Sequence, residues 1–360
     1  MDKPFKNIDE QLDILRSRNL EIDDEKEARE ALTIYGYYEI VNGYKSFILE
    51  SDDSDNFKTG ETFSHLYSLY QLDKDIRNGV LRATLEVELS LRTAIAYTIA
   101  EDFGEKQTDY LNPRNYRRGH KRQNSNRYPL YQLLDKLNNI ANDDIEPYKH
   151  YRENHGNIPP WILLKGTSFG NLVNFYKLLK PKQKDKVISI CTGLPEQFIT
   201  DSIKLMFAQA LCMIHSYRNR AAHSGRLFSY RSQKIMEYNE PLHEKIMEIT
   251  REEYNNGVGQ TGLFTLQNIL SIFKNQRSGF LFEFSVYYSI GYHCQYYPSD
   301  LDLLCEQTMI NKNDMLRGIE KYSKKKKKNT ACKQRCEDVL YRKNGIKKPS
   351  FLYTFYQEMR

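Results

Sequence analysis

Cysteine is sparse in this sequence. The chain has 360 residues and 6 cysteines, which does not suggest the disulfide framework of a small secreted domain. It begins without the apolar core of a signal peptide, and it has no run of about 18 uncharged apolar residues, the length that a membrane-spanning helix needs. We therefore expect a cytoplasmic protein with no membrane partner.

Several well-known catalytic motifs are also missing. The sequence has no Walker loop, dinucleotide fingerprint, nucleophile elbow or His-Glu-x-x-His motif, and we expect no cofactor. Some residues toward the C-terminus are of zinc-ligating types, but they lack the two close cysteine pairs of a strong zinc site, so we predict no metal: His293, Cys294, Cys305, Cys332 and Cys336.

The sequence has no strong two-residue alternation and no internal repeat. Apolar residues instead recur at helical spacing, most clearly over 61–103, where Leu66, Leu69 and Ile76 share a face and Gly79 is an expected break. We predict an all-α fold, with further helices over 8–20, 24–32, 129–140, 146–154, 169–179, 195–224, 233–254, 263–273 and 280–292.

Positive charge is concentrated in the last fifty residues. The net charge is +6, yet residues 311–360 contain about 15 lysines and arginines against about 5 acidic residues. The unbroken lysine run there is either a solubilising tail or a polyanion contact. We include three of its members among the predicted RNA contacts: Lys324, Lys325 and Lys326.

A second basic segment lies between residues 110 and 128 and contains no acidic residue after position 110. Its guanidinium groups alternate with tyrosines, a composition suited to an RNA backbone and to base stacking, although a solvated loop is the alternative. With one arginine from further along the chain, the predicted RNA contacts are Arg114, Tyr116, Arg117, Arg118, Lys121, Arg122, Arg127 and Arg226.

The hexad Arg218-Asn219-Arg220-Ala221-Ala222-His223 closes an apolar helical run and precedes Ser224-Gly225. An arginine can clamp a phosphate, the adjacent amide can orient a partner, and a histidine can transfer protons near neutral pH. Together these groups can cut RNA without a metal. The alternative is that Arg218 and His223 only cap the carbonyls at the end of this helix.

The spacing within the hexad indicates a dimer. Residues five apart on a helix lie about 140° around its axis, so Arg218 and His223 cannot reach one phosphate from the same side of one straight helix. Two copies that face each other across a two-fold axis can supply both groups to a shared cleft. Glu88 and Arg92, one turn apart, form either a buried structural pair or a further contact to that cleft.

The segment from Ser216 to Phe228 resembles the "RN-x-x-AH-x-x-RL" signature of Abi-type bacterial phage-defence proteins, members of the HEPN superfamily. Other segments resemble the same family in its order, over roughly residues 3–230: Lys3-Pro4-Phe5 with 8–15, Tyr37-Tyr38 with Gly43-Tyr44, 72–77 with Glu86, Glu88 and Arg92, and Pro160-Trp161 with Ser168-Phe169-Gly170.

The resemblance implies an all-α HEPN-type helical bundle with an N-terminal helical elaboration. The basic C-terminal extension is not covered by the resemblance, and its role stays open. We expect an N-terminal helical region over 1–60, a helical core over 61–256, C-terminal helices over 257–310 and a basic tail over 311–360. The resemblance also implies a metal-independent endoribonuclease in which Arg218, Asn219 and His223 form the site of a homodimer. Two alternatives stay open: a catalytically silent RNA-binding protein, for example one bound to a small noncoding RNA, and a toxin held by an antitoxin.

Overall fold

The computed structural model describes residues 4–121 and 126–323 of the chain. Within these ranges the named elements are all helices, and the β pairing is limited to two isolated bridges, Glu21–Thr62 and Leu49–Phe57. The all-α prediction is thereby confirmed for the described ranges. No helix in them is both long enough and apolar enough to cross a membrane.

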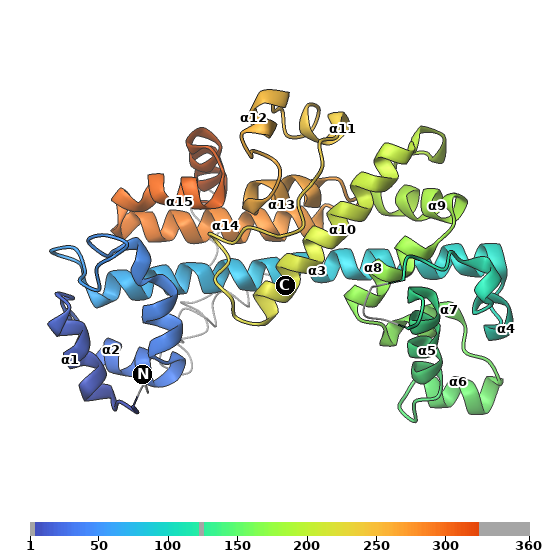
Figure 1. Cartoon of the computed structure of the whole chain (residues 1–360), viewed down its shortest axis with the longest axis horizontal. Helices are drawn as coiled ribbons and strands as arrows, with labels where there is room; N and C mark the ends of the chain where they lie inside the picture. Colours follow the sequence, from blue (N-terminus) through green and yellow to red (C-terminus); the bar gives the residue numbers. More distant parts are fainter. Residues whose placement is uncertain (1–3, 122–125, 324–360) are drawn as a thin grey trace, which may run out of the picture.

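One long helix, α3 (Phe63–Phe103), runs through the molecule and the others pack around it (Figure 1). Helix α14 (Arg277–Tyr296) lies along it in the opposite direction. The predicted break at Gly79 is wrong, since α3 continues through it. A Cβ at Gly79 would come within 2.1 Å of Ser285 Cβ, so the glycine allows α14 to approach closely.

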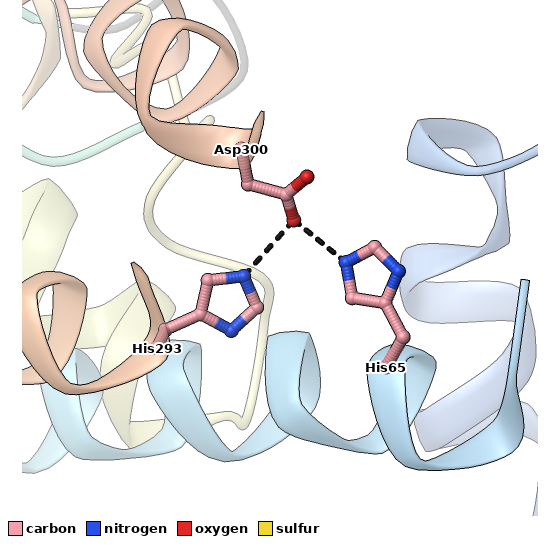
Figure 2. A group of neighbouring side chains, drawn as sticks. All are labelled: His65, His293 and Asp300. Carbon is pink, nitrogen blue, oxygen red and sulfur yellow. Dashed lines mark hydrogen bonds and ion pairs between the residues drawn. The ribbon is translucent and has the colours of Figure 1, made fainter. Parts of the chain in front are cut away.

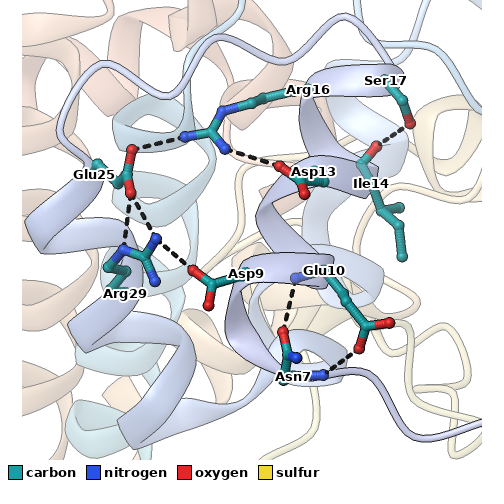
Figure 3. A network of polar contacts seen from close by, with 9 residues as sticks. All are labelled: Asn7, Asp9, Glu10, Asp13, Ile14, Arg16, Ser17, Glu25 and Arg29. Atoms are coloured by element: carbon teal, nitrogen blue, oxygen red, sulfur yellow. Dashed lines mark hydrogen bonds and ion pairs between the residues drawn. The ribbon is translucent and has the colours of Figure 1, made fainter.

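The N-terminal helices α1 (Ile8–Ser17) and α2 (Glu25–Tyr35) pack near the start of α3. Asn7 and Glu10 form a capping box on α1, and Asp24 caps α2. Arg29 of α2 joins the two helices by binding Asp9 of α1, and it also pairs with Glu25 of its own helix (Figure 3). These ion pairs are exposed and screened by water, so they contribute little to stability. The short helices η1 (Tyr38–Asn42) and η2 (Lys45–Phe47) follow.

The opposite end of α3 is covered by the middle of the chain (Figure 1). One of its helices, α9, is absent from the predicted set; it begins at Pro181, and proline fits well in the first turn of a helix although it would end a helix that precedes it. The elements are α4 (Gln107–Tyr110), η3 (Pro113–Asn115), α5 (Pro129–Ala141), α6 (Tyr148–His155), α7 (Pro160–Leu163), η4 (Leu164–Gly166), α8 (Phe169–Leu178), α9 (Pro181–Thr192), η5 (Glu196–Phe198) and α10 (Asp201–Ala222).

The prediction of one helix over 233–254 is wrong. Two short helices stand there, α11 (Glu240–His243) and α12 (Arg251–Asn255). Pro241 begins α11, and the positive φ of 54° at Glu248 ends any helical path between the two. Beyond them lie α13 (Gly262–Ser271), α14, η6 (Pro298–Asp300) and α15 (Leu301–Thr308).

Candidate functional site

The hexad lies at the C-terminal end of α10, which crosses α3 near the middle of the molecule (Figure 1). Thr200 caps the start of α10, and an apolar stripe that includes Phe207, Leu211 and Tyr217 is buried along it. The helix ends at His223, and Ser224 then adopts a positive φ of 56°. The polar groups of the hexad are therefore carried by a firmly packed helix.

Asp73 of α3 holds the chain that follows this helix end. Its fully buried carboxylate accepts hydrogen bonds from the backbone N–H groups of Leu227, at 2.9 Å, and Phe228, at 2.7 Å. It also accepts one from the Tyr44 hydroxyl at 2.8 Å and forms an ion pair with Arg77 at 2.9 Å. Burial raises the pKa of Asp73, and these four donors oppose that effect by stabilising its charge.

Two arginines complete this support. Arg77 Nη1 lies 3.4 Å from the carbonyl oxygen of Ser224, directly after the hexad. Arg226 Nη1 donates to the carbonyl of Gly43 at 2.7 Å, and its guanidinium lies over the Phe47 ring. The turn formed by residues 224–228 is therefore held against α3. The residues that hold it belong to several of the segments that resemble the Abi family.

Arg218 is half-buried and has no acidic partner in the described part of the chain. Its Nε atom is enclosed and without a hydrogen-bond partner there, and its Nη1 makes only a long 3.5 Å contact to Asn219 Oδ1. A buried guanidinium nitrogen without a partner is costly in a folded protein. The positive charge of Arg218 is thus not balanced by an acidic side chain within the described residues.

Asn219 contacts His215 rather than His223. Its Nδ2 donates to His215 Nε2 at 3.0 Å, which requires a neutral imidazole with its proton on Nδ1. Burial lowers the pKa of His215, and the charges of Arg218 and Lys177 lower it further. A Cβ at Gly170 would come within 3.0 Å of His215 Nε2, so the Ser168-Phe169-Gly170 segment makes room for this ring.

His223 is exposed at the end of α10. Its backbone N–H donates to the carbonyl of Asn219 at 3.1 Å, but within residues 4–121 and 126–323 its ring has no hydrogen-bond or ion-pair partner. Neither His223 nor Arg218 uses its side chain to cap a carbonyl of the helix end in these ranges. The imidazole and the guanidinium are both free to meet a ligand.

Lys177 of α8 lies near His215 beside the hexad, and Lys184 of α9 lies near Arg117 of the basic segment. Burial lowers the pKa of Lys184, and Arg117 and Lys177 are among the neighbouring cations that lower it further. Lys177 therefore lies close enough to repel both Lys184 and His215. Exposed Lys177 was not predicted, because a lone lysine on α8 gives no signal in the sequence.

The predicted RNA contacts differ in how exposed their side chains are and in whether they are paired with an acidic residue. Arg114, Arg117, Arg118 and Lys121 are exposed, and Arg127 pairs with Asp135 at 2.7 Å. Arg122, Lys324, Lys325 and Lys326, like Cys332 and Cys336, lie outside the described residues.

Two of the predicted contacts need correction. Tyr116 is only 5% exposed, since its ring packs against Phe103 and Phe175, so no face is open to a base. Arg226 is committed to the turn described above, which gives it a structural role. Of the two alternatives for Glu88 and Arg92, the structure shows the pair, since Arg92 binds the buried Glu88 at 2.6 Å.

These features define an all-α protein with an uncompensated arginine and an open histidine at the end of a central helix. The family model described as Abi-like protein matches residues 30–229, more than half of the chain and all of the turn held by Asp73. The chain belongs to this family, and membership associates it with abortive infection, a bacterial defence against phage. No curated protein and no solved structure matches the chain significantly.

Proposed function

We propose that this protein is a HEPN-type, metal-independent endoribonuclease that acts as a homodimer in phage defence. The observation that carries the proposal is the pair of unengaged side chains, Arg218 and His223, at the end of α10. Lys177 on α8 supports it, because this exposed charge lies near His215 and would attract a polyanionic substrate to that surface.

Cleavage of RNA requires few protein groups, because the RNA supplies its own nucleophile. Its own 2′-hydroxyl attacks the adjacent phosphorus, so the protein has to move protons and stabilise charge on the phosphate oxygens. His223 takes the proton from the 2′-hydroxyl or gives one to the departing 5′-oxygen. Arg218 stabilises the charge of the transition state through paired N–H donors. The products are a 2′,3′-cyclic phosphate and a free 5′-hydroxyl.

The two groups need a second copy of the chain to meet. Their places around α10 differ by about 140°, and the structure holds Arg218 half-buried against Asn219 while His223 points into solvent. Exposed apolar residues at helical spacing on α3, Leu85, Leu89 and Tyr97, supply a surface of the kind that self-association covers.

A mixed dimer tests this arrangement. We expect Arg218→Ala and His223→Ala homodimers to be inactive. Heterodimers of the two variants, purified through a different tag on each chain, should recover about half of the wild-type cleavage rate, since one Arg218 and one His223 from opposite copies remain. If each chain forms its own site, the heterodimer stays as inactive as either parent. A monomeric mass by light scattering would also contradict the dimer.

Lys177 tests the path of the RNA. We expect Lys177→Glu to weaken RNA binding about tenfold, or ~1.4 kcal/mol, and to lower the slope of log affinity against log salt by about 1. The control is Lys26→Glu, an exposed lysine on α2 beside the far end of α3. Fluorescence anisotropy with a labelled single-stranded RNA measures the affinity of each variant and its dependence on salt. Equal losses for the two variants would place the RNA elsewhere.

One observation favours the alternative of an RNA-binding protein that does not cut. Asn219 is engaged with His215 and does not orient His223. Under this alternative, natively purified protein would retain an intact RNA, and Arg218→Ala would release it. Under control by an antitoxin, the purified protein would instead retain a partner protein. Cleavage of added RNA by the partner-free protein would decide for the nuclease.

A further inference from the structure

Two histidines and an aspartate from distant parts of the chain meet in a second polar cluster (Figure 2). His65 lies on α3, His293 on α14 and Asp300 on η6. Their Nε2 atoms lie 2.7 and 2.9 Å from the same Asp300 oxygen, Oδ2. All three are buried, with exposed fractions of 7%, 1% and 8%.

The other ring nitrogens are also engaged. His65 Nδ1 lies 2.5 Å from Glu61 Oε2, and His293 Nδ1 lies 2.8 Å from Ser68 Oγ. A carboxylate only accepts hydrogen bonds, so Nδ1 of His65 carries the proton. Such outer contacts are typical of metal-binding histidines, because they fix the ring and leave the Nε2 lone pair for the metal.

Asp300 also only accepts hydrogen bonds, so each Nε2 atom that faces it carries a proton while no metal is bound, and His65 is then a buried cation between two carboxylates. A metal ion can take the place of the Nε2 protons between the two rings and Asp300. We infer that His65, His293 and Asp300 bind one zinc ion, which clamps α14 and η6 to the start of α3. Two imidazole nitrogens and one carboxylate oxygen suit zinc, with a water in the fourth position.

The spacing of the three side chains fits this ion after a small adjustment. Ligand atoms in a tetrahedral zinc site lie about 3.4 Å apart, given bonds of about 2.0–2.1 Å. The two Nε2–Oδ2 separations would therefore open by about 0.7 and 0.5 Å. Tyr297, stacked on His65 with 4.1 Å between ring centres, covers one side of the cluster.

The cluster is separate from the hexad. His65 precedes Arg77 by twelve residues on α3, or about 18 Å along a helix, and Arg77 contacts the turn after His223. Two of the three ligands, His293 and Asp300, also lie beyond the residues that the family model matches. The zinc would accordingly take no part in the chemistry proposed at the hexad, and it contradicts the expectation that the chain holds no metal.

Metal content tests the inference. Full-length protein is equilibrated with zinc sulfate, desalted and analysed by mass spectrometry of the metal. We expect one zinc per chain in the wild type and in the control Asp302→Asn, whose exposed carboxylate pairs with Lys312 nearby. Asp300→Asn, which keeps the shape of the side chain, should retain at least tenfold less. A chelator should lower the melting temperature of the wild type by several degrees and leave that of Asp300→Asn unchanged.

Cobalt provides a readout that needs no variant. Stripped wild-type protein titrated with Co²⁺ should develop the strong visible absorption of a tetrahedral centre, saturating at one equivalent. A wild type that gains neither zinc nor this absorption would overturn the inference and would assign a proton to Nε2 of His65 instead. Equal zinc in the wild type and Asp300→Asn would overturn it as well.

Discussion

Replacing His223 by alanine is expected to slow RNA cleavage by about 10²- to 10⁴-fold, the usual contribution of a general acid or base. The ring has no partner within the described ranges, so the folding free energy should change by no more than about 0.5 kcal/mol. The measurement is the cleavage rate of a labelled RNA in EDTA, well below the melting temperature. Unfolding in urea checks the fold.

The matched control is His155→Ala. His155 is also exposed and also lies in the last turn of its helix, α6, so the same change is made in a similar setting away from the hexad. We expect wild-type cleavage from this variant. Equal rates for His223→Ala and the wild type would show that the cleavage does not depend on this histidine, and the proposed chemistry would be wrong.

Asp73→Ala is expected to destabilise the protein by about 3–5 kcal/mol, because it leaves the buried Arg77 without its counter-charge. It also removes the acceptor for the N–H groups of Leu227 and Phe228, so the turn after His223 loosens and cleavage falls with it. Urea unfolding measures the free energy, and the cleavage assay measures the second effect.

Tyr44→Phe is the matched control for this prediction. It removes one hydroxyl from the same network and leaves Asp73 with three donors, so the expected loss is only about 1 kcal/mol. If Asp73→Ala cost no more than Tyr44→Phe, the carboxylate would not be what holds the turn against α3.

The parts of the site that lie on one helix could be predicted from the sequence. Arg218 and Asn219 lie near the end of α10 and His223 is its C-cap, so their spacing alone placed them there. The one-turn spacing of Glu88 and Arg92 offered their ion pair as one of two alternatives. The helical spacing of apolar residues also predicted α3, because its buried face repeats over 41 residues.

Contacts between distant segments could not be predicted in this way. Asp73 acts on residues more than 150 positions away, and His65 meets His293 and Asp300 only because α14 returns along α3. The same limit explains the errors. Tyr116 has the composition of an RNA contact, yet Phe103 and Phe175 enclose it, and Gly79 marks the approach of another helix rather than a break.

The most direct test of the proposed nuclease is the chemistry of the RNA ends. A short RNA is incubated in EDTA with the wild type or with His223→Ala, and the fragments are weighed by mass spectrometry. We predict fragments with a 2′,3′-cyclic phosphate and a 5′-hydroxyl from the wild type and none from the variant. Fragments with 5′-phosphates, or the same cyclic products from both proteins, would contradict the proposal that His223 drives attack by the 2′-hydroxyl.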